Sequence, residues 1–144
     1  MDRSKSDYAI IQELHLVIEY YYGSSNAEII IKTRERQLAD ANFRDIKRAL
    51  LVFENVAVSE DIASEVEKYA AYLSTKKEEL ASRKIAFVTN NPVEVVIGYL
   101  SQLYLMKLNK GLEVFSTVPA ALSFLGIETS SKRVLDAIDK LRKS

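Results

Sequence analysis

Two uninterrupted apolar runs constrain the fold of this chain more than any other feature. They are "ALLVF" at 49–53 and "KIAFVT" at 84–89. Neither run alternates polar with apolar residues, so each predicts a strand that is covered on both faces. Between them, the segment 60–80 places its apolar residues three and four apart, which predicts one buried face of a helix. Strands that alternate with helices indicate a mostly parallel sheet with helical cover.

The first forty residues leave two alternatives open. Residues 8–25 are rich in Ile, Val and Tyr and end in Gly-Ser-Ser, which favours one long strand or a tight two-stranded hairpin. In the next segment "EIIIK" suits a strand, whereas Asn26 followed by Glu28 suits the start of a helix. The later "KTRERQLAD" has strong helix propensity. We therefore predict a helix over 26–40, with these residues loosely on one face: Ala27, Ile30, Ile31 and Leu38.

Capping and stop residues predict the remaining elements. Asn91 and Pro92 suit the start of a helix that runs to Gly111, and residues 112–116 form a short strand. Residues 117–126 predict a short helix that ends at a glycine. The last helix, 130–144, is amphipathic, with these residues on its apolar side: Val134, Leu135, Ile138 and Leu141. The predicted order is β(β)–α–β–α–β–α–β–α plus an extra C-terminal helix, with a sheet of four to five strands.

Composition excludes several classes of protein. A chain of 144 residues suits one domain. Lys plus Arg and Asp plus Glu both number 20, and no basic stripe is present, which argues against nucleic-acid binding. Without cysteine there are no disulfides, thiolate metal sites or cysteine nucleophiles. No apolar run is long enough to span a membrane, and the N-terminus lacks a signal-peptide core, so we expect a cytoplasmic protein.

Several stretches together carry a family resemblance. They are "LVIEYYYG", "DANFRD", "ALLVF", "FENVAVSEDI", "KIAFVTNNPVEVVIGYL" and "LEVFSTVPAALSFLG". Over residues 8–126 the chain resembles the STAS / anti-sigma-factor antagonist superfamily, and most closely its SpoIIAA-like (STAS-like) bacterial members. The resemblance implies a single SpoIIAA-like α/β domain over 8–126 with a binding role, no enzymatic activity and no cofactor. Residues 127–144 would then be an added amphipathic helix, docked on the domain or contacting a partner.

The resemblance draws attention to Ser59. Some STAS domains carry a phosphorylated serine at the start of the second helix, within an Asp-Ser-Ser-Gly-like run. The matching stretch here is "VAVSEDI", in which Ser59 is the only serine and Glu60 and Asp61 stand where small residues are expected. As an N-cap, the Ser59 hydroxyl would stabilise the helix by about 0.5–2 kcal/mol, and the two acids suit the helix dipole. A phosphate beside two carboxylates would be repelled. We interpret Ser59 as a cap, with regulation as the alternative.

Asn90 and Asn91 form a second candidate at the end of a strand. "TNNP" links a covered strand to a helix N-terminus, where an anion can bind, and ligands of open α/β sheets bind at this edge. No glycine-rich phosphate loop accompanies it, so Asn91 as a helix cap is the simpler interpretation. Together Ser59, Asn90 and Asn91 are the candidate regulatory or ligand site, for a lipid or a nucleotide.

Three further features are more ordinary. His15 is the sole histidine, and we interpret it as a surface-facing strand residue rather than a metal ligand. Tyr20, Tyr21 and Tyr22 alternate across a strand and are expected to pack. The helix after Asn91 carries a second apolar stripe, which meets a neighbouring helix, the C-terminal helix or another subunit. This candidate interaction face consists of Val95, Tyr99, Leu103 and Met106.

These observations favour a non-enzymatic, STAS-like regulatory or protein–protein interaction module, bacterial and homodimeric or bound to another protein. The alternative is a small-ligand binding domain that uses the strand ends near Ser59 and Asn90. A third hypothesis is an enzyme or phosphoacceptor domain on a flavodoxin-like sheet. It depends on Glu54 at a strand end, which would have to lie beside other carboxylates around a metal ion.

Overall fold

The computed structural model describes residues 4–58, 62–76, 83–89, 91 and 111–144. Its centre is a five-stranded sheet in the order β1-β2-β3-β4-β5. The first two strands, β1 (Lys5–Ile11) and β2 (Leu16–Ser25), are antiparallel. The other three run parallel to β2 and are β3 (Arg48–Val58), β4 (Lys84–Val88) and β5 (Gly111–Phe115). The predicted α/β class and mixed, mostly parallel sheet are confirmed.

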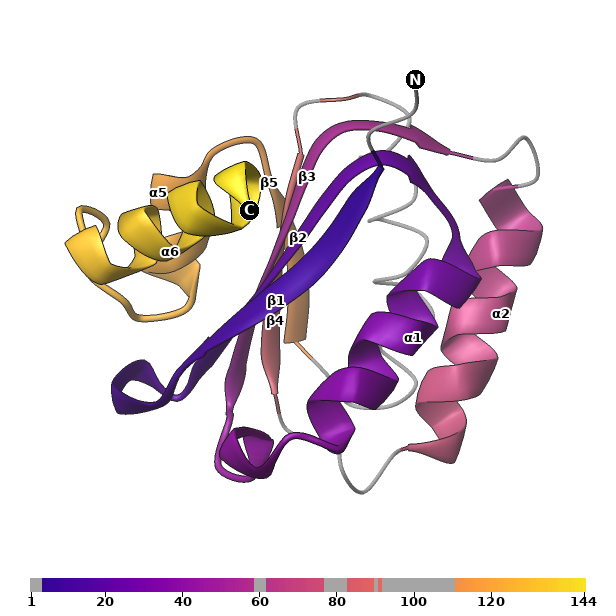
Figure 1. Ribbon diagram of the computed structural model, residues 1–144, viewed down its shortest axis with the longest axis horizontal. Helices are drawn as coiled ribbons and strands as arrows, with labels where there is room; N and C mark the ends of the chain where they lie inside the picture. Colours follow the sequence, from indigo (N-terminus) through magenta and orange to yellow (C-terminus); the bar gives the residue numbers. More distant parts are fainter. Residues whose placement is uncertain (1–3, 59–61, 77–82, 90, 92–110) are drawn as a thin grey trace.

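Helices cover both faces of this sheet (Figure 1). On one face lie α1 (Ala27–Leu38) and α2 (Ile62–Thr75), and on the other lie α5 (Val118–Phe124) and α6 (Lys132–Lys143). Helices that connect parallel strands in one direction, with one handedness, share a face, which is why α1 and α2 lie together. Among the described strands the order never reverses, so this part of the sheet has no topological switch point of the kind that makes a ligand crevice.

Side-chain alternation along the strands divides the core into two layers. Leu16, Ile18 and Tyr20 of β2 belong to the apolar cluster beneath α5 and α6, whereas Val17 and Tyr21 belong to the cluster beneath α1 and α2. The strand β3 alternates in the same way, and its apolar run is buried on both faces, as predicted. None of the helices among the described residues is long and apolar enough to cross a membrane.

The predicted helix starts are confirmed where the structure describes them. The Asn26 side chain accepts a hydrogen bond from the Ile29 backbone N–H at 2.9 Å, so the helical alternative for 26–40 is correct. Thr117 caps α5 in the same way, through the backbone N–H of Ala120 at 3.3 Å. Each cap satisfies one of the donors that a helix start leaves without an intrahelical partner.

The first two strands form a hairpin, so the two-stranded alternative for residues 8–25 is correct. The strand β1 begins at residue 5, and a short 3-10 turn (Gln12–Leu14) joins it to β2. His15 closes this turn in the left-handed conformation, with φ at 49°. The prediction that His15 lies within a strand is therefore wrong, although the residue is exposed. The physical reason is the positive φ that the turn requires, a conformation in which histidine is enriched several-fold.

The Gly-Ser-Ser segment is the last part of β2. Gly23 has a φ of 82° and lies where the register between β2 and β3 shifts. A Cβ atom on Gly23 would lie 2.8 Å from the Cα of Ser4, and the hydroxyl of Ser4 accepts a hydrogen bond from the Ser24 backbone at 3.0 Å. Only glycine fits this close approach of two backbones.

Two predicted helix faces need correction. On α1 the fully buried side chains are Ala27, Thr33, Arg34 and Gln37, whereas the isoleucines are only partly buried. Burial of Arg34 is explained by an acidic partner on the sheet, which the helical pattern alone does not reveal. On α6, Val134, Ile138 and Leu141 are buried as predicted, but Leu135 remains 44% exposed because it lies off the narrow contact stripe.

Candidate functional site

The residues singled out from the sequence fall largely outside the described residues. This applies to Ser59, Asn90 and the stripe Val95, Tyr99, Leu103 and Met106. Asn91 is described, and its backbone N–H donates to the Thr89 hydroxyl at 3.1 Å. The Thr89 backbone N–H in turn donates to the Phe115 carbonyl at 3.0 Å. Asn91 is thus placed just beyond the carboxyl end of β4, beside β5.

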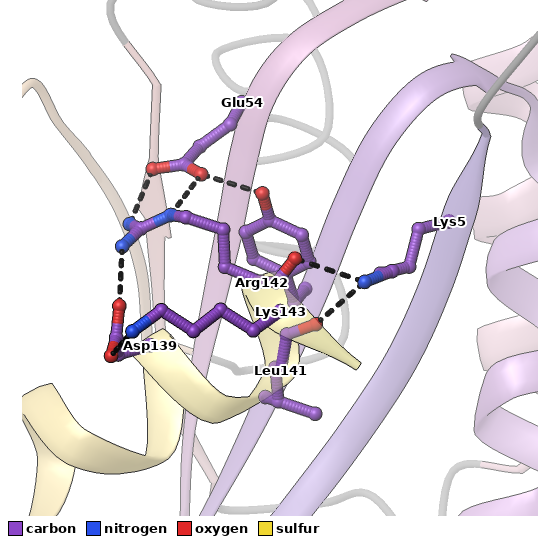
Figure 2. Close-up of polar contacts among 7 residues, drawn as sticks. Lys5, Glu54, Asp139, Leu141, Arg142 and Lys143 are labelled. Atoms are coloured by element: carbon purple, nitrogen blue, oxygen red, sulfur yellow. Dashed lines mark hydrogen bonds and ion pairs between the residues drawn. The ribbon is translucent and has the colours of Figure 1, made fainter.

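Glu54, near the carboxyl end of the same sheet, holds the C-terminal helix (Figure 2). Arg142 of α6 donates to both carboxylate oxygens of Glu54, through Nε at 2.8 Å and Nη2 at 2.7 Å. Tyr20 of β2 donates its hydroxyl to Oε1 of Glu54 at 2.6 Å. A bidentate guanidinium–carboxylate pair with a third donor fixes geometry as well as charge.

The charge state of this cluster follows from its hydrogen bonds. Arg142 and then Tyr20 donate to Glu54, which lowers the pKa of the carboxyl below its ordinary value. Burial, followed by the hydrogen bond to Glu54, raises the pKa of Tyr20 to about 12. At neutral pH Glu54 is an acceptor and Tyr20 a donor. Among the described residues, the hydrogen-bond partners of the Glu54 carboxylate are Arg142 and Tyr20.

Lys5 of β1 also binds the C-terminal end of α6. Its Nζ donates to the carbonyl of Leu141 at 3.1 Å and to that of Arg142 at 3.0 Å (Figure 2). It also contacts the Ser144 carbonyl. A cation at a helix C-terminus is stabilised by the helix dipole and by carbonyls that lack intrahelical donors. We refer to Lys5, Tyr20, Glu54 and Arg142 as the C-terminal clamp. It joins β1, β2 and β3 to the last turn of α6.

A second charged cluster lies inside the layer between the sheet and α1. Glu19 of β2 and Arg34 of α1 form an ion pair at 2.8 Å, with side chains 0% and 1% exposed. Tyr21 donates its hydroxyl to Glu19 at 2.5 Å, and Arg34 donates to the Tyr69 hydroxyl of α2 at 3.1 Å. We refer to Glu19, Tyr21, Arg34 and Tyr69 as the buried charge cluster.

Burial controls the protonation of this cluster. The pKa of Tyr21 rises well above its ordinary value, first because the phenol is buried and then because of the charge of Glu19. Burial acts to lower the pKa of Arg34, but Glu19 and the nearby phenol groups more than offset it, so the net shift is upward. Arg34 therefore stays charged, and Tyr21 stays a hydrogen-bond donor. Such a pair is stable in a core only when hydrogen bonds satisfy it on several sides.

Two further polar side chains are buried among the described residues. Gln37 of α1 is fully buried, and neither its amide nitrogen nor its amide oxygen has a hydrogen-bond partner among the described residues. Arg83, just before β4, is 7% exposed and lies over the Phe43 ring at 4.1 Å. Burial, followed by the charge of Arg34, lowers the pKa of Arg83 to about 10. These groups are a rare case of buried polar atoms left without partners.

Sequence reasoning missed both charged clusters. A signal for the buried one exists, since Glu19 sits between Val17 and Tyr21 on the covered face of a strand. A charged residue at such a position requires a partner. On α1, Arg34 and Gln37 are three residues apart and so share a face. The clamp has no comparable signal, because Glu54 and Arg142 are 88 residues apart in the chain.

A polar hollow of about 490 Å³ lies at the opposite end of the parallel strands from the clamp. Its lining residues are Gln12, His15, Ala41, Asn42, Arg44, Asp45 and Ile46. The hollow includes the sole histidine, but no described cluster of His, Cys, Asp or Glu in the protein has the makings of a metal site. It therefore does not support a metal role for His15.

The chain matches no protein-family model, and no curated protein matches it either.

Proposed function

We propose that this chain is a non-enzymatic, STAS-like regulatory or protein–protein interaction module that associates with itself or with another protein. The observation that carries the proposal is the order and direction of the strands in the sheet. An antiparallel first strand precedes four parallel strands that follow one another in chain order, with α1 and α2 on one face. This order of strands and helices supports the resemblance of the chain to SpoIIAA-like proteins.

The ionisable groups near the strand ends support a binding role over a chemical one. Glu54 and Tyr20 are engaged in the C-terminal clamp, which fixes a helix in place. Fold alone does not determine function, so the proposal also needs a contact surface. We assign it to the stripe Val95, Tyr99, Leu103 and Met106, whose spacing in the sequence is that of one helix face. Large apolar residues gathered in such a stripe characterise interaction surfaces.

Association in solution tests the proposal. Sedimentation velocity over a range of protein concentrations should show a dimer that L103D and Y99D weaken by tenfold or more, a loss of at least about 1.4 kcal/mol. The matched control is L135D, since Leu135 is an exposed leucine on α6 and its replacement should leave association unchanged. A wild-type protein that stays monomeric and captures no partner would sink the proposal, as would equal weakening by all three variants.

A substitution at Ser59 separates capping from regulation. Aspartate is as good an N-cap as serine, so S59D should leave the free energy of unfolding nearly unchanged. If Ser59 is only a cap, S59D also leaves association unchanged. Loss of association in S59D, with stability intact, would instead assign Ser59 the regulatory role that the matching position has in some STAS domains.

The second candidate is a small-ligand domain that binds a lipid or a nucleotide near Ser59 and Asn90. Asn91 and Thr89 favour it, because they place polar groups at the carboxyl end of β4, the edge where parallel sheets bind ligands. Thermal unfolding with nucleotides and with lipid vesicles decides the matter. A ligand at 100 times its Kd should add about 2.7 kcal/mol, and no stabilisation by any of them removes this candidate.

A further inference from the structure

The strand β1 lies at one end of the sheet, and none of the other described strands pairs with its outer edge. In an antiparallel pair, the backbone N–H and C=O groups of alternate residues point away from the partner strand. The Tyr8 N–H is one of these outward groups, because it donates to the Asp7 carboxylate at 2.8 Å. Ser6 and Ile10 have the same parity as Tyr8, so their amides also belong to the outer edge. Such an edge is a template on which another strand can pair.

The Asp7 side chain passes around this edge from one face of the sheet to the other. Asp7 has the same parity as Ala9 and Ile11, whose side chains belong to the cluster beneath α5 and α6. Its carboxylate nevertheless forms an ion pair at 3.2 Å with Arg36 of α1, on the opposite face. Because β2 occupies the inner side of β1, the Asp7 side chain has to cross at the outer edge.

Groups at the end of α1 hold Asp7 and Tyr8 in this arrangement. The Arg36 guanidinium, besides its ion pair with Asp7, lies over the Tyr8 ring at 5.2 Å from the centroid. The Tyr8 hydroxyl donates to the carboxylate of Asp40 at 2.9 Å. The outward amide at the centre of β1 is therefore occupied, and a charged carboxylate lies where an added strand would approach.

We propose that Asp7 prevents a second copy of this chain from adding its own β1 strand to this edge. A second β1 fits, since two copies related by a two-fold axis at Tyr8 pair over the whole strand of seven residues. In that register Lys5 faces Ile11 and Asp7 faces Ala9, so no like charges are opposed. Pairing requires the Tyr8 N–H to donate to the other copy, and the Asp7 carboxylate occupies it. This role of Asp7 is separate from the proposed interaction surface and does not depend on it.

Amide hydrogen exchange, followed by NMR, tests the wild-type protein first. The Tyr8 amide should have a protection factor at least tenfold higher than those of Ser6 and Ile10. These two amides share the outer edge, but no side chain among the described residues accepts from them. Equal protection at the three positions overturns the proposal.

Self-association of substituted proteins tests the consequence. D7A removes both the acceptor and the charge, so in sedimentation velocity it should self-associate at protein concentrations at least tenfold lower than the wild type does. Hydrogen exchange should then show new, concentration-dependent protection confined to residues 5–11. D7N keeps an acceptor oxygen for the Tyr8 N–H and should behave as the wild type does. The matched control D136A removes an exposed carboxylate from α6 and should also leave association unchanged.

The same comparison with L103D present in every protein separates this edge from the proposed interaction surface. The added association of D7A should persist there, whether or not the wild type forms a dimer through that surface. The proposal is overturned if D7A associates no more readily than the wild type, or if D7N or D136A associates as D7A does. It is also overturned if the new protection lies outside β1 or disappears with L103D. If D7A does not fold, the exchange of the wild-type amides decides.

Discussion

Two of the ion pairs that join helices to the sheet have nearly the same distance and opposite surroundings. The Arg34–Glu19 distance is 2.8 Å and the Arg142–Glu54 distance is 2.7 Å. The first pair is 1% and 0% exposed, whereas the second is 45% and 33% exposed. Each pair also receives a tyrosine hydroxyl, from Tyr21 in one case and Tyr20 in the other.

The difference in burial decides what each pair contributes. Removing two charges from water costs several kcal/mol per ion, so a buried pair contributes little net stability but becomes costly when one partner is lost. A pair that stays in contact with water contributes about 0–1 kcal/mol, and its loss costs no more than that. Distance alone therefore does not rank these interactions. The buried pair specifies the position of α1 on the sheet. The exposed pair helps to orient α6, which apolar contacts already hold in place.

The largest effect should come from R34M. This substitution keeps the volume of the side chain but leaves Glu19 buried without its cation, so the free energy of unfolding should fall by about 3–5 kcal/mol. Urea-induced unfolding followed by circular dichroism measures the change.

The double variant E19L/R34M is the control for that effect. It removes both charges, so most of the lost stability should return, less the contribution of the hydroxyls of Tyr21 and Tyr69 that lose their partners. If the double variant is as unstable as R34M, the loss comes from packing and the comparison of the two ion pairs fails.

A smaller but still substantial loss is expected for I138A on α6. Ile138 is buried in the cluster beneath α5 and α6, so its truncation should lower the free energy of unfolding by about 2–4 kcal/mol. The control L135A changes an exposed residue on the same helix and should stay within about 0.5 kcal/mol. Urea unfolding of both variants shows whether apolar packing, rather than the C-terminal clamp, supplies most of the free energy that keeps α6 on the sheet. Equal losses in the two variants would contradict this view of the helix.

How much of this could be predicted from the sequence differs between the fold and the charged clusters. The covered runs at 49–53 and 84–89 predicted buried parallel strands, and Asn26 predicted a helix start. These features are local, because burial pattern and capping are properties of neighbouring residues. His15 was misplaced because its positive φ depends on where the hairpin turns.

The clusters depend on pairings between distant residues, which periodicity does not specify. Burial of Arg34 was not predicted, because Glu19, its partner, lies on a different element. The clamp joins the first, second and third strands to the last helix turn, so its residues meet only after the whole chain has folded. The sequence nevertheless shows a charged residue, Glu19, on the covered face of a strand. A buried carboxylate needs a cation, so this partner could have been predicted.

The smallest effect should come from the clamp, and its pH dependence distinguishes it from the buried pair. R142Q should lower the free energy of unfolding at neutral pH by about 0.5–1 kcal/mol, since solvent screens a half-exposed pair. The pKa of Glu54 is lower in the folded protein than its ordinary value of 4.5. Its stabilising contribution is therefore full above that ordinary value and is lost as the pH falls through the folded pKa. The difference between wild type and R142Q should vanish in acid.

Y20F sharpens this last prediction because it removes one donor to Glu54 and leaves Arg142 in place. The hydrogen bonds from Arg142 lower the pKa of Glu54 more than the hydroxyl of Tyr20 does. The carboxyl pKa, measured by NMR titration, should therefore rise in both variants, and further in R142Q than in Y20F. A larger rise in Y20F would mean that the phenol, buried on the sheet, holds the carboxylate. The clamp would then resemble the buried charge cluster, and exposure would not be what separates the two ion pairs.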